Sequence, residues 1–286
     1  MSVPFDVAQA LALARAGGVE RLDAQRLLAS LIHRPRSWLL AHGDNALDAG
    51  QASAFRAGLM RLVAGEPLAY LTGEQEFHGL LLRVSPQVLV PRADTEVLAD
   101  WAIERLSIGP AAPRVLDLGT GSGAIALALA HACPTAHVSA VDISSGALVV
   151  ARANGERLGL AVEWIESNWW GALAKRRFDL IVSNPPYIAD GDAHLAALHH
   201  EPLLALTAGG DGLDALRHIA ASAAQHLSPG GWLLLEHGYD QAEAVSALLR
   251  SRGLHEVQTR HDLAGHPRCT GACLARASVG ETPHIP

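Results

Sequence analysis

The sequence has few cysteines and no long apolar run, and each shortage excludes a class of protein. Three cysteines in 286 residues are too few, and odd in number, for a disulfide framework, so we expect reduced thiols in a cytoplasmic protein. The most apolar stretch, 124–130, is far too short to span a bilayer. The first residues lack the basic start and apolar run of a signal peptide. We therefore expect neither a membrane protein nor a secreted one.

Positive charge is also scarce. Lys and Arg together number 22 against 29 acidic residues, which gives a net charge of −7. A protein that grips nucleic acid through phosphates usually presents a basic face, so we expect no direct binding of nucleic acid. We expect no metal either, because Cys269 and Cys273 have no second pair to complete the usual four zinc ligands.

The length and the residue spacing predict two domains. Hydrophobic residues make up 49% of the sequence, which is enough for a real core. Apolar residues such as Leu27, Leu28 and Leu31 follow helical spacing, and short extended runs broken by turn residues come next. The predicted organisation is a helical N-terminal domain over 1–75, a hairpin linker over 76–92, a larger domain over 93–278 and a loose tail over 279–286.

Strands and helices alternate through the larger domain. A helix is expected from Glu96, with Asp94 or Thr95 capping its first turn. Alternation at this spacing predicts a mostly parallel sheet with helices on both faces. Strands are expected at 115–118, 138–141, 162–165, 180–182, 232–235, 255–259 and 273–275, and helices at 124–132, 147–158, 214–227 and 242–250.

A glycine-rich loop, 116–124, lies between the first of these strands and its helix. Glycines let the backbone turn tightly against a ligand, and the helix start offers N–H groups. The loop also satisfies the dinucleotide fingerprint G-x-G-x-x-A, so a nicotinamide-dependent oxidoreductase stays open. A carboxylate at Asp117 favours a cofactor with an ammonium and a sulfonium, S-adenosylmethionine, over a pyrophosphate. Asp142, at the end of the next strand, is predicted to accept from the ribose hydroxyls.

The segment 184–187, Asn-Pro-Pro-Tyr, follows the strand expected at 180–182. An amide or aniline-like nitrogen is a poor nucleophile, because its lone pair is delocalised. The Asn184 carbonyl and the main-chain carbonyl of Pro185 offer two acceptors that would fix an NH2 group in space. The prolines stiffen the loop, and Tyr187 offers a face for a planar group. The pattern predicts methylation of an amino or amide nitrogen and leaves adenine, cytosine and glutamine open.

The sequence resembles the peptide chain release factor N(5)-glutamine methyltransferases over nearly its whole length. The resemblance implies a seven-strand Rossmann-like class I methyltransferase domain with a small helical N-terminal domain for substrate recognition. It also implies that the acceptor is the glutamine of a Gly-Gly-Gln tip on a release factor, and we expect a monomer. The segments that carry it are 70–73, 90–96, 117–126, 182–188, 201–203 and 235–238.

The residues and the resemblance together give a set of expected site residues. The cofactor contacts are expected from Asp117, Gly119, Thr120, Gly121, Ser122, Gly123, Asp142, Asn168, Trp169 and Asn184. Catalysis is expected from Asn184, Pro185 and Tyr187, and substrate contacts from Asn184, Pro185, Pro186, Tyr187 and Arg92. Asp94 and Glu96 are expected near the mouth of the site.

Two departures from the family's pattern bear on specificity. Asn168 stands where an aspartate is common, and the segment before Glu201 looks short and carries 199–200, His-His, where an arginine is common. Glutamine methylation of a large-subunit ribosomal protein therefore stays an alternative. A DNA or RNA amino-methyltransferase would need a basic groove and a way to extrude the base, which the charge disfavours. A cofactor-binding module without catalysis is a further alternative.

Overall fold

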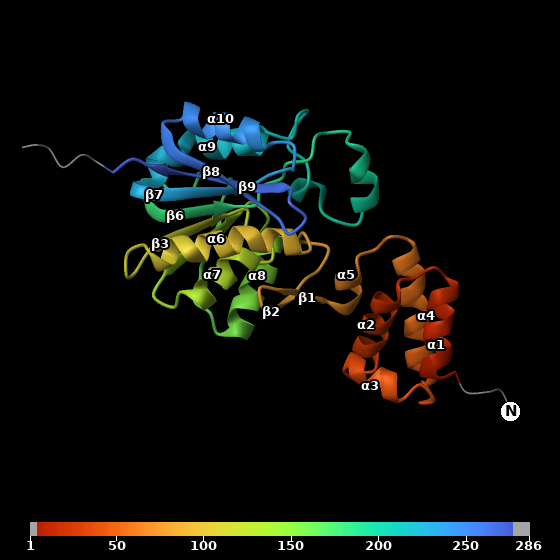
Figure 1. Ribbon diagram of the computed structural model, residues 1–286. Coiled ribbons are helices and arrows are strands. Elements are labelled where there is room, and N and C mark those ends of the chain that lie inside the picture. The colour runs from red at the N-terminus through yellow and green to blue at the C-terminus, as the bar shows by residue number, and fades with distance from the viewer. Residues whose placement is uncertain (1–4, 277–286) are drawn as a thin grey trace, which may run out of the picture. The chain divides into compact units, whose positions relative to one another are not determined.

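The computed structural model describes residues 5–276 (Figure 1). The tail expected over 279–286 lies outside these residues. The described chain divides into two compact units. The smaller holds the residues up to 74 together with 84–86, and the larger holds 75–83 and the residues from 87 onward.

The smaller unit is helical, as the spacing of its apolar residues predicts. Val7, Leu28 and Phe55 are completely buried in its core. The first helix begins at a capping box, in which Asp6 and Gln9 each accept a hydrogen bond from the other's backbone N–H, so its N-terminal N–H groups are satisfied. The helices are α1 (Val7–Ala16), α2 (Arg21–Leu31), α3 (Arg36–Ala41), α4 (Ala49–Val63) and α5 (Leu68–Thr72).

A hairpin lies in the segment where the units divide. Its turn residues His78 and Gly79 both have positive φ, 51° and 76°, which is what a two-residue type I′ turn requires. The carboxylate of Glu96 accepts the backbone N–H of His78 at 2.9 Å, so the start of the next helix holds the turn. The two strands are β1 (Glu74–Phe77) and β2 (Leu80–Arg83).

The larger unit is built on a seven-stranded sheet in the order β5-β4-β3-β6-β7-β9-β8. The first five of these strands are parallel, and β9 runs antiparallel to β7 and β8 between them. The expectation of a mostly parallel sheet is confirmed. The strands are β3 (Arg114–Leu118), β4 (His137–Asp142), β5 (Glu163–Glu166), β6 (Phe178–Ser183), β7 (Leu227–Glu236), β8 (Leu254–His261) and β9 (Pro267–Leu274).

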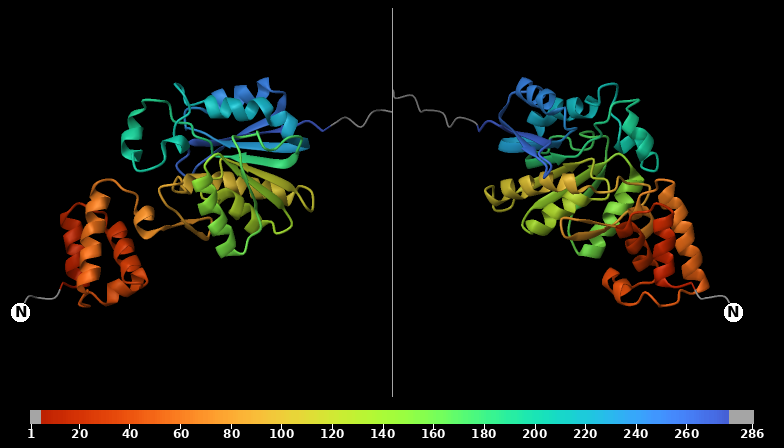
Figure 2. Two further views of the ribbon diagram at one scale, coloured as in Figure 1. Left: turned by 180° about the vertical axis from the view of Figure 1, so that it is seen from behind. Right: turned by 45° about the vertical axis from the view of Figure 1, so that its right-hand side comes forward.

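Helices cover both faces of this sheet (Figure 2). Successive strand residues point to opposite faces. Val115 accordingly packs with Trp101 on one side of the sheet, and Leu116 packs with Leu216 and Leu249 on the other. The helices are α6 (Glu96–Ser107), α7 (Ala124–Ala132), α8 (Ser145–Leu158), α9 (Asp214–His226) and α10 (Ala242–Ser251), with the 3₁₀ turns η1 (Ala93–Thr95), η2 (Ala193–Leu198) and η3 (Leu203–Ala205).

Two strands are longer than their apolar residues predict. β7 begins at Leu227 and β9 at Pro267, well before the expected starts at Trp232 and Cys273. Pro229 and its two following glycines resemble a turn, and the strand keeps an irregularity there: Gly230 has a φ of 81°, and the pairing with β6 passes from Leu227 directly to Trp232. The turn signal is therefore met by a bulge within the strand.

Helix α6 begins at Glu96 as expected, but without the expected cap. Neither Asp94 nor Thr95 makes a side-chain capping bond, because Asp94 pairs with Arg268 at 3.1 Å and the Thr95 hydroxyl contacts Asn184. Contacts with residues far along the chain therefore take the place of the capping bonds that the local sequence predicts. Among the described residues, no helix is both long enough and apolar enough to cross a bilayer.

Candidate active site

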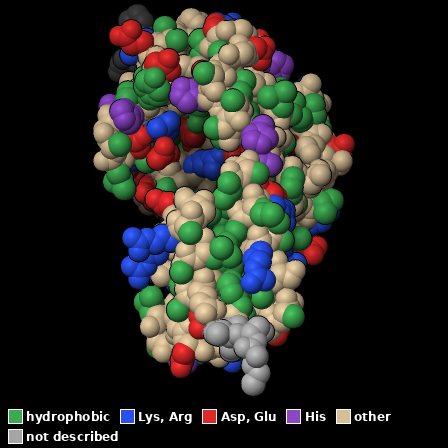
Figure 3. Space-filling model, turned by 90° about the vertical axis from the view of Figure 1, so that its right-hand side faces the viewer, with side chains coloured by type: hydrophobic (Ala, Val, Ile, Leu, Met, Phe, Trp, Pro, Cys, Tyr) green, Lys and Arg blue, Asp and Glu red, His purple; other side chains and the backbone are tan. Residues whose placement is uncertain are grey.

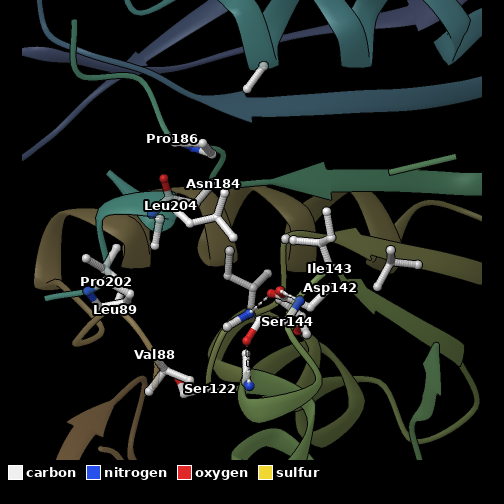
Figure 4. Close-up of a pocket in the computed structure, with 18 of the residues that line it drawn as sticks. Val88, Leu89, Ser122, Asp142, Ile143, Ser144, Asn184, Pro186, Pro202 and Leu204 are labelled. Atoms are coloured by element: carbon white, nitrogen blue, oxygen red, sulfur yellow. Dashed lines mark hydrogen bonds between the residues drawn. The ribbon is translucent and has the colours of Figure 1, made fainter. Parts of the chain in front are cut away.

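A cavity of about 460 Å³ lies at the carboxyl ends of β3, β4 and β6. The chain leaves β3 toward β4 on one side and returns to β6 on the other, so this is the place where open α/β sheets bind ligands. Figure 4 shows Asn184 and Pro186 bordering the cavity on one side and Asp142 with its neighbours on another, while Pro202 and Leu204 come from a separate loop. The space-filling view shows acidic and basic side chains gathered at a hollow of the larger unit (Figure 3).

The loop between β3 and α7 is shaped by glycines and by its own backbone bonds. Gly119, Gly121 and Gly123 have φ of 73°, 56° and 84°, a region that strains any residue with a Cβ. The N–H groups of Gly119 and Thr120 both donate to the carbonyl of Val141, at 2.8 and 2.9 Å. Of the loop residues expected at the cofactor, the cavity is lined by Gly119, Thr120, Gly121 and Ser122.

Two residues expected at the cofactor do not line the cavity. The Cβ of any other residue at Gly123 would come within 3.2 Å of Ala151 and 3.0 Å of Trp164, so this glycine serves packing. The carboxylate of Asp117 is completely buried and accepts from the Thr120 hydroxyl (2.6 Å) and from the backbone N–H of Ala126 (3.2 Å). Through its Oδ2 it caps the first turn of α7, while its Oδ1 has no hydrogen-bond partner among the described residues, so the cofactor contact expected of Asp117 stays a prediction.

Burial raises the pKa of Asp117 to about 7, against the two hydrogen bonds it accepts. The charge of Asp142 acts in the same direction. Like-charge repulsion and desolvation both disfavour the ionised form. The inner end of the loop thus holds a carboxyl group that takes up a proton far more readily than an exposed aspartate.

Asp142 lies where the sequence predicts a cofactor contact. Its Oδ2 accepts the Gly121 N–H and its Oδ1 accepts the Ser144 N–H, both at 2.9 Å. Each carboxylate oxygen has a further lone pair, so both can accept from a ligand as well. Burial raises the pKa of Asp142. The residue lines the cavity and ties the glycine loop to the end of β4.

Asn168 and Trp169 both line the cavity. Trp169 has a φ of 50°, a strained conformation for a bulky residue that persists only where the surrounding structure enforces it. A Cβ built on Gly119 would lie 3.6 Å from the nearest atom of the Trp169 ring. The centroids of the Trp169 and His218 rings are 6.4 Å apart. The indole is thus placed beside the glycine loop, where a flat group in the cavity would meet it.

The acceptor segment is held by side chains from distant parts of the chain. Asn184 lines the cavity, and its Nδ2 donates to the Thr95 hydroxyl at 3.2 Å. The hydroxyl of Tyr187 donates to the buried carboxylate of Glu236 at 3.3 Å, and burial with that neighbouring charge raises the Tyr187 pKa. The Tyr187 main-chain carbonyl accepts from Gln241 at 3.0 Å. Asn184 and Pro186 line the cavity, whereas Pro185 and Tyr187 are not among its lining residues, so their contacts with a substrate stay predictions.

Arg92 lines the cavity and forms an ion pair with Glu201. The side chain of Glu201 is only 2% exposed, and it also accepts the backbone N–H of Val90 at 3.1 Å. This carboxylate therefore joins two loops that both border the cavity. Among the described residues, no group of three or more His, Cys, Asp or Glu side chains is placed to hold a metal ion.

Sequence reasoning missed several wall residues. Thr95 and Glu201 stand in segments that carry the family resemblance, but their partners lie 89 and 109 residues away and no local pattern reveals them. The apolar residues that line the cavity, and the lining residues from α9, also follow no pattern that the sequence reveals. These missed lining residues include Val88, Leu89, Ile143, Leu204, Asp214 and His218.

Known proteins match both units. The family model described as the PrmC N-terminal domain matches residues 8–73, and that described as the methyltransferase small domain matches 100–211. A release factor glutamine methyltransferase of Bordetella pertussis is 52% identical over 260 residues, which cover 90% of this chain and 96% of the relative. One of Escherichia coli is 42% identical, covering 92% and 95%. The crystal structure of a methyltransferase from Pyrococcus furiosus, 18% identical, covers 76% of this chain and 97% of its own with a TM-score of 0.53.

Proposed function

This chain belongs to the release factor glutamine methyltransferases, S-adenosylmethionine-dependent enzymes, and on that premise we propose how its cavity carries out the reaction. It transfers a methyl group to the side-chain amide nitrogen of the glutamine in the Gly-Gly-Gln tip of peptide chain release factors. The observation that carries this proposal is that Asn184 lines the same cavity as the glycine loop and Asp142.

The residues of the cavity fit S-adenosylmethionine. Gly119 and Gly121 keep Cβ atoms out of the space beside their loop, and Asp142 has lone pairs left for the ribose hydroxyls. Asn168 and Trp169 stand where an adenine could be met by an amide carbonyl and an indole face. When bound, this molecule supplies a methyl carbon activated by its sulfonium.

Asn184 and the loop after it hold the acceptor. The Asn184 carbonyl accepts one N–H of the glutamine amide, and the main-chain carbonyl of Pro185 accepts the other. With both N–H bonds held, the NH2 group is fixed in space and its lone pair is directed at the methyl carbon. Most of the acceleration comes from this positioning. No strong base is needed, because the nitrogen becomes acidic as it gains the methyl group.

Further residues of the chain are assigned to contacts with the substrate. Arg92, paired with Glu201, borders the acceptor side, and the ring of Tyr187 offers a face on which the planar amide of the glutamine can stack. We assign substrate recognition to the helical N-terminal domain over 1–75, as the family resemblance implies, and the PrmC N-terminal domain matches 8–73 of it. The enzyme acts as a monomer in the cytoplasm, where release factors work, and its net charge of −7 suits a protein substrate better than a nucleic acid.

A labelling assay tests the function. Purified protein, S-adenosylmethionine with a labelled methyl group and a release factor should give labelled release factor, and a Gln→Ala change at the Gly-Gly-Gln tip should abolish the label. Label that persists on the altered factor would overturn the acceptor. Label on ribosomal protein or nucleic acid in place of the factor would overturn the partner.

A further inference from the structure

A buried carboxylate stands behind the acceptor segment. Glu236, at the end of β7, is 1% exposed. Its Oε1 accepts from the Tyr187 hydroxyl, and its Oε2 has no hydrogen-bond partner among the described residues. Thr95 is a neighbour whose side chain lowers the pKa of Glu236, so its hydroxyl is the candidate donor for this oxygen. A buried carboxylate oxygen without a hydrogen-bond donor costs free energy, so a neighbouring hydroxyl group that can donate to it should do so.

Thr95 also contacts Asn184. Thr95 is 5% exposed, and its Oγ1 lies 3.2 Å from Nδ2 of Asn184. A hydroxyl has one proton and two lone pairs. It therefore can donate to only one of its two neighbours, and it must accept from the other.

The carboxylate of Glu236 determines which neighbour receives the proton of the Thr95 hydroxyl. An ionised Glu236 only accepts, so the Thr95 proton turns toward it and a Thr95 lone pair is left for Asn184. Asn184 must then present its NH2 to Thr95, which leaves its Oδ1 free. With the opposite arrangement, Thr95 would donate to Oδ1, and the Asn184 NH2 would face the NH2 of the acceptor, donor against donor.

We propose that Glu236 and Thr95 are positioning residues that fix the orientation of the Asn184 amide, so that its carbonyl oxygen points to the acceptor nitrogen. The order of donation is Asn184 Nδ2 to Thr95 and Thr95 to Glu236. This inference rests on the proposed function for its kinetic consequence, but the amide orientation can be measured without any substrate.

Charges around Glu236 support its role as an acceptor. Burial raises its pKa to about 7, while Arg268 lowers it and Asp94 raises it. Arg268 is itself held by Asp262 at 2.8 Å. The other titratable neighbours are Tyr187 and Cys269, whose pKa values are both raised by burial, so neither carries charge near neutrality. Above the pKa of Glu236, the carboxylate only accepts.

The kinetic test compares two changes at one position, assayed above the pKa of Glu236. Thr95→Val keeps the shape and removes the hydroxyl, and it should lower kcat by roughly 10²-fold, the scale of removing one hydrogen bond that acts in the transition state. Thr95→Ser keeps the hydroxyl and should retain kcat to within about 3-fold of the wild type, a difference of under 1 kcal/mol in barrier height. The affinity for S-adenosylhomocysteine should hold in both. Thr135→Val, which removes an exposed hydroxyl bonded to the Ala111 carbonyl, is the matched control and should keep full kcat.

Glu236→Gln tests the direction of the relay. Its amide can donate to Thr95, which frees the Thr95 proton for Asn184 Oδ1, so a loss of kcat comparable to that of Thr95→Val is expected at normal cofactor affinity. Melting temperatures separate this from unfolding. A Thr95→Val enzyme with wild-type kcat, or a Thr95→Ser enzyme as slow as Thr95→Val, would overturn the proposal.

Neutron diffraction of the wild-type protein decides the orientation itself. Deuterons should lie on the Asn184 atom that faces Thr95, and the atom facing the cavity should carry none. Deuterons on the cavity side would overturn the relay whatever the enzyme methylates. Failure of the wild type to label any release factor, with the expected orientation, would overturn the proposed function instead.

Discussion

The two sides of the cavity are held in different ways. On the cofactor side, the N–H groups of Gly119 and Thr120 bond to the backbone carbonyl of Val141, and Asp142 holds the Gly121 N–H. On the acceptor side, two contacts at the cavity join side chains from distant segments, Asn184 with Thr95 and Arg92 with Glu201. A loop held by its backbone tolerates side-chain changes in shape but not in φ. A loop held by side chains depends on single atoms, so we expect single substitutions there to affect turnover more than binding.

Asn184→Ala should give the largest effect and the clearest separation of the two sides. Losing the acceptor carbonyl should lower kcat by roughly 10²–10³-fold, as for one hydrogen bond formed in the transition state. The affinity for S-adenosylhomocysteine, measured by titration calorimetry, should change little. An equal loss in both would show that the two sides are not independent.

Asp142→Ala should act on the opposite side. It removes the acceptor for the Gly121 and Ser144 N–H groups along with the proposed ribose contact. Affinity for S-adenosylhomocysteine should fall by roughly 10–100-fold, since a hydrogen bond to a charged group contributes about 1.5–3 kcal/mol. Asp142→Asn, which keeps one acceptor oxygen, should lose less. With saturating cofactor, kcat should recover, and a kcat that stays low would contradict the division.

The pH dependence of stability should report on Asp117. Its folded pKa, about 7, is above the ordinary aspartate value of 3.8, so the folded state binds the proton more tightly. Its stabilising contribution is present in full below the unfolded pKa and is lost as the pH rises through about 7, at no more than about 1.4 kcal/mol per pH unit.

Asp117→Asn removes this titration. The free energy of unfolding of the variant, relative to the wild type, should therefore rise between the two pKa values and then level off. Asp142, whose charge also raises the Asp117 pKa, and Glu236 titrate in both proteins. Their contributions to the difference in unfolding free energy therefore largely cancel. Denaturant titrations across this range check the slope. Parallel pH profiles for the two proteins would show that the carboxyl does not titrate as a buried group.

The smallest expected effect concerns the ion pair at the mouth. Arg92→Gln leaves the buried Glu201 carboxylate with only the Val90 N–H, but the arginine side chain is 42% exposed and its charge is partly screened. We expect a loss of about 1 kcal/mol in stability and a higher KM for the release factor at little change in kcat. Glu201→Gln in the same background should recover part of the stability. No recovery would show that the pair does not act as a unit.

The sequence predicts the contacts of the cofactor side better than those of the acceptor side, because contacts between distant segments leave no local pattern. The glycine loop and Asp142 are recognisable because their partners lie at the ends of adjacent strands, and the helix starting at Ala124 was placed correctly. A threonine just before Glu96 predicts a helix cap, but Thr95 makes no capping bond and contacts the acceptor segment instead. Asp117 caps α7 through its Oδ2, a role that its position beside the glycines does not predict.

Neither role follows from rules that use only neighbouring residues. A threonine before a helix satisfies a capping pattern whatever lies across the fold, and a carboxylate beside glycines suits a cation whichever way it points. The fold class itself followed from the alternation of strands and helices, because that pattern is repeated many times. The extent of β7 does not follow, because a Pro-Gly-Gly segment usually ends a strand, whereas here the strand carries it as a bulge between Leu227 and Trp232.

The position of β9 has a consequence for how the chain is made. β9 comes later in the sequence than β7 and β8, yet it is inserted between them, and β8 has no other ladder partner. During synthesis β7 and β8 therefore emerge with unpaired edges, which are prone to join other chains, until residues 267–274 leave the ribosome.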